Sequence, residues 1–137
     1  NIPLDELRER MGEIPSDKAV YLFCGVGLRG YLASNILKEN GYNPTLVDAR
    51  FIKPLDEDCY RHLFDSHKVI VTLEDNTRIG GYGSAVLDLL TDLGYTDKKL
   101  FRFGLPDSFV EQGNIQDLYK LLKIDGESVA KQLLEKL

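Results

Sequence analysis

The chain has 137 residues, a formal net charge of −5 and a pI near 5.0, with 43% hydrophobic and 28% charged residues. This length suits one compact domain with a real core and is too short for two full α/β domains. Because the chain is acidic, without a basic stripe or an RNA-binding aromatic motif, nucleic acid is not expected as a partner. No apolar run approaches the roughly 18 residues of a membrane-spanning helix. We therefore expect a soluble protein that acts on a metabolite or contacts another protein, and no membrane partner.

The cysteines and histidines predict no metal site. Cys24 and Cys59 fit neither a CxxC motif nor a zinc-ligand spacing, so no disulfide framework is expected either. Two cysteines that form no disulfide framework suit a reducing, cytoplasmic location. His62 and His67 are five residues apart, which differs from the i, i+4 spacing of a helical metal pair, and we expect both on the surface.

Predicted strands and helices alternate along the chain. An amphipathic helix is expected over residues 3–11, from apolar residues at helical spacing that end before Gly12. Further helices are expected at residues 31–40, 56–64, 84–93, 115–122 and 127–137. Strands are expected at residues 19–23, 45–47, 68–73 and 99–103. The run KVIVTL is apolar throughout, as in a strand covered on both faces. The alternation predicts an α/β fold, a single domain over residues 1–137 with a three-layer, mostly parallel sheet.

The sequence LFCGVGLRG, residues 22–30, joins the first predicted strand to a helix. Such a loop can lower the pKa of a thiol, because backbone N–H groups, a helix N-terminus and a cation all favour the thiolate. Cys24 is the candidate nucleophile and Arg29 the candidate cation. The anion-binding amides are expected from Gly25, Val26, Gly27, Leu28 and Gly30.

The spacing Cys-x4-Arg is one residue shorter than that of cysteine phosphatases, so a small sulfur anion suits this loop better than a phosphoryl group. The alternative is an inert cysteine at a strand end, followed by a tight turn. Both interpretations stay open at the level of the sequence. Cys59 falls in a predicted helix and is assigned no chemistry.

Residues 1–43 resemble the second half of a rhodanese domain, of the kind attached to coenzyme A disulfide reductases. The segments NIPLDELR, CGVGLRG and the following helix match in order. In that family the matching cysteine carries a persulfide, which the loop amides stabilise. The resemblance implies the same role for Cys24. The preceding half of a rhodanese domain, with its Asp-x-Arg-like motif, has no match in this sequence.

Residues 44–137 resemble another family, the C-terminal domain of 1-deoxy-D-xylulose-5-phosphate synthases, which are thiamine diphosphate enzymes of the transketolase group. The matching segments are TLVDARFIKPLDED, HKVIVTLEDNTRIGGYGSAVLDLL, GLPDSFVEQGN and LYKLLKIDGESVAKQL. Together the two resemblances imply a chimera, engineered or natural, joined near residues 41–44. Its expected fold is that of a transketolase C-terminal domain with a rhodanese-like first βα unit.

The larger resemblance implies a domain that packs and extends a dimer. In that family the metal-diphosphate motif and the activating glutamate belong to earlier domains, and neither occurs in this sequence. We therefore expect no bound cofactor, no thiamine diphosphate binding by this chain alone and no synthase activity. Expected partners are a second copy of the chain or transketolase-type domains. The alternative is a sulfurtransferase or persulfide carrier that uses Cys24 and binds a small sulfur anion.

Two further features are weak candidates for a site. The turn containing Gly80, Gly81 and Gly83 opens a helix after a strand and could bind an anion through its amides. Glycines that permit a close turn and helix packing are the preferred interpretation. Glu74 and Asp75 follow the KVIVTL strand, where ligands collect in open α/β sheets. Acid–base catalysis would need a partner that the sequence does not identify, so solvated or interface carboxylates are the preferred interpretation. Arg50, Lys53 and Arg78 could contribute positive potential near the strand ends, and a solvated or domain-contact role is an equal alternative for them.

Overall fold

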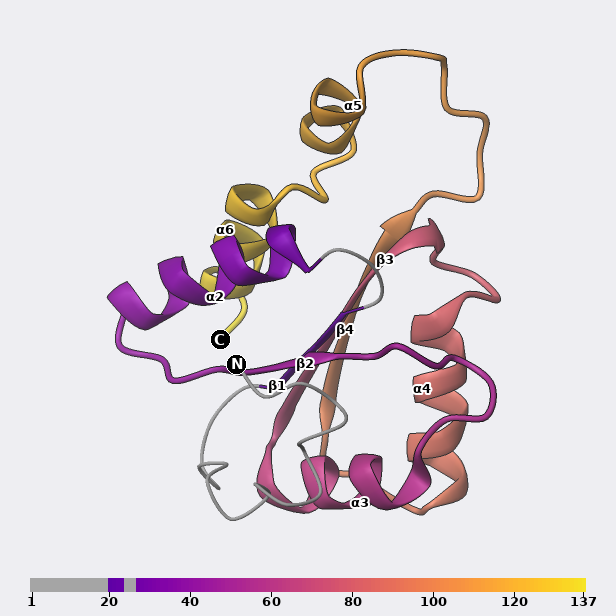
Figure 1. Cartoon of the computed structure of the whole chain (residues 1–137). Coiled ribbons are helices and arrows are strands. Elements are labelled where there is room, and N and C mark those ends of the chain that lie inside the picture. Colours follow the sequence, from indigo (N-terminus) through magenta and orange to yellow (C-terminus); the bar gives the residue numbers. More distant parts are fainter. Residues whose placement is uncertain (1–19, 24–26) are drawn as a thin grey trace.

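The computed structural model describes residues 20–23 and 27–137 (Figure 1). The strands are β1 (Val20–Phe23), β2 (Thr45–Asp48), β3 (Val69–Thr77) and β4 (Lys99–Leu105). The helices are α2 (Leu28–Glu39), α3 (Glu57–Ser66), α4 (Tyr82–Asp92), α5 (Ile115–Leu121) and α6 (Gly126–Leu134). The helix predicted over residues 3–11 lies outside the described residues.

The four strands form one sheet in the order β2-β1-β3-β4, and every neighbouring pair is parallel. The first described strand is therefore central: Val20 lies opposite Thr45 on one side and Ile70 on the other. β4 is an edge strand that pairs only with β3 among the described residues.

Helices cover both faces of the sheet, and Figure 1 shows α3 and α4 on one side and α2 and α6 on the other. Ile70 and Val71 are neighbours in β3 but belong to separate cores, because successive side chains of a strand point to opposite faces. Ile70 packs with Phe64 of α3, and Val71 packs with Leu37 of α2. The predicted three-layer, parallel α/β fold is confirmed.

Two elements extend furthest beyond the bounds that the apolar pattern predicted, α2 at its beginning and β3 at its end. α2 begins at Leu28, directly after Gly27, whose φ of 72° ends the preceding loop. β3 continues beyond Leu73 to Thr77, with an irregular pairing to β4 between those two residues. The pattern missed this extension because its residues are polar and all but Glu74 are at least partly exposed. The extension carries Glu74 and Asp75, so these carboxylates lie within the sheet and not in a loop.

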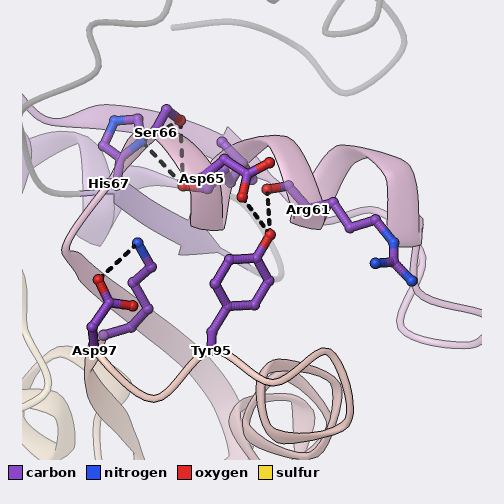
Figure 2. Close-up of polar contacts among 8 residues, drawn as sticks. Arg61, Asp65, Ser66, His67, Tyr95 and Asp97 are labelled. Atoms are coloured by element: carbon purple, nitrogen blue, oxygen red, sulfur yellow. Dashed lines mark hydrogen bonds and ion pairs between the residues drawn. The ribbon is translucent and has the colours of Figure 1, made fainter.

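The prediction of surface histidines is wrong for His67, which is 1% exposed. His67 follows the last residue of α3, and its ring lies next to Ser66 (Figure 2). The Ser66 hydroxyl donates to the carbonyl oxygen of His62 at 2.7 Å, so the hydrogen-bond network assigns a proton to Nδ1 of His67, 2.8 Å from that hydroxyl. Nε2 then accepts from the Thr45 hydroxyl at 3.3 Å. These bonds allow a polar ring to be buried.

Candidate functional site at the carboxyl ends of the strands

Arg29 joins three elements at the end of the sheet where the strands finish. Its Nη2 donates to Oδ1 of Asp75 in β3 at 2.7 Å, and Nη1 donates to the carbonyl oxygen of Ile124 at 3.2 Å. The guanidinium lies 4.1 Å from the ring centre of Tyr119 in α5. Tyr119 completes the cluster, because its hydroxyl donates to Oδ2 of Asp75 at 2.9 Å.

The charges in this cluster neutralise one another. Burial raises the pKa of Tyr119 above its ordinary value, and the hydrogen bond to Asp75 raises it further, while Arg29 lowers it in part. Tyr119 therefore stays protonated at neutral pH and donates to the carboxylate. Arg29, proposed from the sequence as the cation beside an anion, has Asp75 as its counter-charge, which supports a structural joint between α2, β3 and α5.

A cavity of about 370 Å³ adjoins the cluster, between the beginning of α2 and the helices α5 and α6. Arg29, Asp75 and Tyr119 form part of its wall, together with Asp125. Exposed apolar side chains border it: Leu28, Leu32 and Ile115. A mouth with these side chains suits contact with another protein surface better than a hydrophilic metabolite.

Comparison with protein families gives a match to the transketolase C-terminal domain over residues 31–129. The chain belongs to the transketolase C-terminal domain family. The matched region begins inside α2 and runs through β4 to α6, so it includes most of the described fold.

Curated relatives of this family member are 1-deoxy-D-xylulose-5-phosphate synthases. The enzyme of Caldanaerobacter subterraneus subsp. tengcongensis is 41% identical over 108 residues, which are 76% of this chain and 17% of that protein. Synthase 1 of Geobacter sulfurreducens is 41% identical over 136 residues, covering 94% of this chain and 21% of that protein. The chain thus spans about a fifth of the length of these relatives.

Among solved structures, a split-gene transketolase described as an inactive beta4 tetramer superimposes with a TM-score of 0.78. The sequence identity is 23%, over 89% of this chain and 39% of that chain, and the likeness shows a shared fold. The predicted transketolase C-terminal fold is confirmed by this structure and by the family match.

The rhodanese segment and the chimera receive no support from these comparisons. The family match crosses residues 41–44, where the join was placed, and begins within the helix assigned to the rhodanese-like part. The Geobacter synthase aligns with 94% of the chain, so it covers most of residues 1–43 as well. One family therefore accounts for sequence on both sides of the predicted join.

Glu74 holds the first turn of α4. It is 1% exposed, and its two carboxylate oxygens accept hydrogen bonds from the backbone N–H groups of Tyr82 at 2.7 Å and Gly83 at 2.8 Å. A carboxylate at this place satisfies helix N–H groups and interacts favourably with the helix dipole. The chain's own glutamate thus occupies the amide of Gly83, one of those that the sequence suggested for an external anion, together with the amide of Tyr82.

The glycines of this turn allow the close approach of β3 and α4. A Cβ at Gly81 would lie 2.2 Å from the Glu74 carboxylate, and one at Gly83 would lie 2.6 Å from the Thr72 hydroxyl. Gly80 has a φ of +75°, and its N–H donates to the hydroxyl of Ser84 at 2.9 Å. Close packing, the second interpretation offered by the sequence, accounts for Gly81 and Gly83, and the positive φ of the turn accounts for Gly80.

The cysteine loop is described only in part. Cys24, Gly25 and Val26 lie outside the described residues, so their predicted role stays a prediction. Gly27 immediately precedes α2, while Leu28 and Gly30 belong to its first turn. No side chain caps this helix among the described residues. Cys59 is in α3 as predicted, with 2% of its surface exposed.

Sequence reasoning missed the tyrosines that connect distant elements. Tyr119 was not singled out, because 44 residues separate it from Asp75 and no local pattern links them. Tyr60 and Tyr82 share a buried hydrogen bond of 2.7 Å between their hydroxyl groups. Figure 2 shows a third case, in which the hydroxyl of Tyr95 donates to Asp65 at 2.5 Å.

Within residues 20–23 and 27–137, no group of three or more histidine, cysteine, aspartate or glutamate side chains is placed to hold a metal ion. The helices of that same part of the chain are all too short or too polar to cross a membrane. Of the cations expected near the strand ends, Arg50 lies 3.8 Å from Asp48, and Arg78 lines a groove at the edge of the sheet.

Proposed function

We propose that this chain is the assembly domain of a thiamine diphosphate enzyme of the 1-deoxy-D-xylulose-5-phosphate synthase type. Family membership and the match to about a fifth of each synthase support this role. The domain packs against the other domains of such an enzyme, or against a second copy of itself, and extends the assembled surface. It does not carry out the synthase reaction alone and does not bind thiamine diphosphate alone.

The observation that carries this proposal is a set of exposed apolar side chains at one end of the sheet. Each belongs to a segment that follows the carboxyl end of a strand, and the exposed fraction ranges from 56% to 100%. They are Leu28, Phe51, Ile79, Phe109 and Ile115. Single exposed apolar residues are common, but several at one end of a fold mark a contact surface.

The segment of residues 106–113 supports the same conclusion. It leaves β4 and projects from the body of the domain before α5 begins (Figure 1). Among the described residues, no hydrogen bond ties its backbone to the rest of the fold. Phe109 lies in it with 100% of its surface exposed. A large, exposed aromatic side chain on a segment whose backbone is not hydrogen-bonded to the rest of the described fold is suited to insert into another surface.

The test uses the Caldanaerobacter synthase truncated before its matched region, mixed with this chain. We expect association in analytical ultracentrifugation and a gain of deoxyxylulose phosphate formation over the truncated enzyme alone. The variant Phe109→Ser should weaken association, whereas Leu87→Ser, on the exposed side of α4, should not. Absence of association, or equal weakening by the two variants, would contradict the proposed role.

The sulfurtransferase alternative has less support. It needs Arg29 to balance charge on an anion held beside Cys24, and the guanidinium is paired with Asp75 and stacked on Tyr119. No sulfur anion is needed to account for any described residue of the loop.

A further inference from the structure

We propose that the free edge of β4 is a docking groove for an extended, acidic polypeptide segment, which adds to the sheet as a fifth strand. The groove has a volume of about 700 Å³ and runs along β4 between the turn after β3 and the helices α5 and α6. Five consecutive residues of β4, Leu100 to Gly104, belong to its wall. Successive side chains of a strand point to opposite faces of the sheet. A groove lined by five consecutive residues therefore runs along the backbone edge of β4 and not over one face of the sheet.

The pairing with β3 determines which backbone groups of β4 remain open. Lys99 donates its N–H to the carbonyl oxygen of Lys68 at 2.9 Å, on the β3 side. In a parallel ladder alternate residues bond to the same neighbour, so Phe101 and Phe103 also face β3. Leu100 and Arg102 therefore direct their N–H and C=O groups into the groove. Within residues 20–23 and 27–137, these four groups have no partner.

The charge of the groove determines the chemistry of the partner. Its lining contains four cations, Arg78, Arg102, Lys123 and Lys136, against one carboxylate, Asp107. No carboxylate among the described residues forms an ion pair with any of these cations, although the whole chain carries a net charge of −5. A local excess of positive charge on an acidic protein favours an acidic partner.

The cations lie on both faces of the edge strand. Arg102 is on the α4 face, where its Nη1 donates to the Ser84 hydroxyl at 3.1 Å. Lys136 is on the opposite face, 5.7 Å from the ring centre of Phe101. Successive side chains of an added strand point to alternate faces, so acidic side chains on either face meet a cation.

The same charges argue against pairing of β4 with β4 of a second copy. Such a contact would bring two sets of unpaired cations together at the edge. Lysine and arginine on an edge strand commonly prevent this self-association. The groove therefore selects an acidic strand and rejects its own copy. The groove adjoins the end of the sheet used for assembly, because Ile79 and residues 106–107 belong to both surfaces. The inference rests on the open backbone groups and the charges of β4 and does not depend on the assembly role.

The test uses two fluorescein-labelled peptides, one of alternating glutamate and valine and one of alternating lysine and valine. We expect saturable binding of the glutamate peptide in fluorescence anisotropy and at least about tenfold weaker binding of the lysine peptide. The double variant Arg102→Glu with Lys136→Glu should weaken binding of the glutamate peptide by a similar factor. The matched control, Lys38→Glu with Lys131→Glu, makes the same change of net charge outside the groove and should have little effect.

Backbone participation is tested by Leu100→Pro, which removes an outward N–H without touching the ladder to β3. This variant should have the circular dichroism spectrum of the unmodified chain and should no longer bind the glutamate peptide. Hydrogen exchange in the unmodified chain gives an independent measurement: the amides of Leu100 and Arg102 should exchange fast alone and at least about tenfold more slowly with the peptide. Equal affinity for both peptides, or slow exchange of these two amides without peptide, overturns the proposal.

Discussion

Glu74 and Tyr82 are connected by a hydrogen bond of 2.7 Å that joins a strand to the next helix. The N–H of Tyr82 donates to Oε2 of Glu74, and the N–H of Gly83 donates to Oε1 at 2.8 Å. This carboxylate is almost fully buried, yet both of its oxygens are satisfied by the helix that it caps. The contact fixes the direction in which α4 leaves the turn.

Glu74→Gln tests the importance of this cap. Glutamine keeps the size of the side chain but has one acceptor oxygen, so a buried N–H of α4 loses its partner. We expect the free energy of unfolding to fall by about 1–3 kcal/mol, as is usual for a buried donor left unsatisfied. Urea denaturation measures the difference. Glu127→Gln, an exposed glutamate in the first turn of α6, is the control and should change stability much less.

Gly81→Ala tests the close packing of the turn. The new Cβ would lie 2.2 Å from both the Glu74 carboxylate and the backbone oxygen of Thr77, and the backbone cannot yield easily. We expect a loss of about 1–3 kcal/mol, typical of overpacking. Gly113→Ala is the matched control, because its Cβ would meet only the Leu118 side chain at 3.4 Å. Equal melting temperatures for the two variants would show that the turn has room.

Much of the architecture could be predicted from the sequence because the signals are local. Each predicted strand between residues 19 and 103 is present, and Asp56 marks the beginning of α3 by accepting from the N–H of Cys59 at 3.2 Å. Strand order is not local. β1 is central in the sheet because it pairs with both β2 and β3. No pattern within residues 19–23 reveals these two pairings.

The candidate site was harder to predict, because its chemistry depends on partners far apart in the chain. Arg29 was the candidate cation for the loop of Cys24, five residues away, and its guanidinium pairs with Asp75, 46 residues away. Glu74 was a weak candidate for a ligand-binding carboxylate, with a solvated or interface position as the other interpretation, and it caps a helix instead. Residue type and spacing identified both side chains, but only the fold shows which group each one meets.

Tyr95 provides a pH-dependent signal for the contact between α3 and the turn after α4. Its hydrogen bond to Asp65 is the main cause of a pKa raised above 10.0, and slight burial adds to the shift. Asp65→Asn removes the carboxylate and should lower the pKa of Tyr95, measured by NMR titration of tyrosine labelled with carbon-13. Asp92→Asn, on exposed α4 surface, should leave the pKa of Tyr95 unchanged.

The same shift gives the sign of a stability change. The folded-state pKa of Tyr95 lies above its unfolded value, so the contact contributes its full stability below pH 10.0 and loses it as the pH rises through the folded value. The melting temperature of Asp65→Asn should therefore differ most from that of the unmodified chain at neutral pH, and this difference should shrink in alkaline solution. A difference in melting temperature that grows above pH 10.0 would contradict this assignment.

Thiol alkylation separates the assembly role from the sulfurtransferase alternative. Cys59 is 2% exposed and should react slowly in the folded chain, so Cys59→Ala leaves Cys24 as the reporter. Because Arg29 is paired with Asp75, we expect the alkylation rate of Cys24 to follow the pH dependence of an ordinary thiol, with no thiocyanate formed from thiosulfate and cyanide. Asp75→Asn removes the counter-charge of the Arg29 guanidinium, so the alkylation rate of Cys24 in this variant is compared with the rate in the unmodified chain. Fast alkylation at neutral pH in the unmodified chain, together with thiocyanate production, would instead establish a sulfurtransferase.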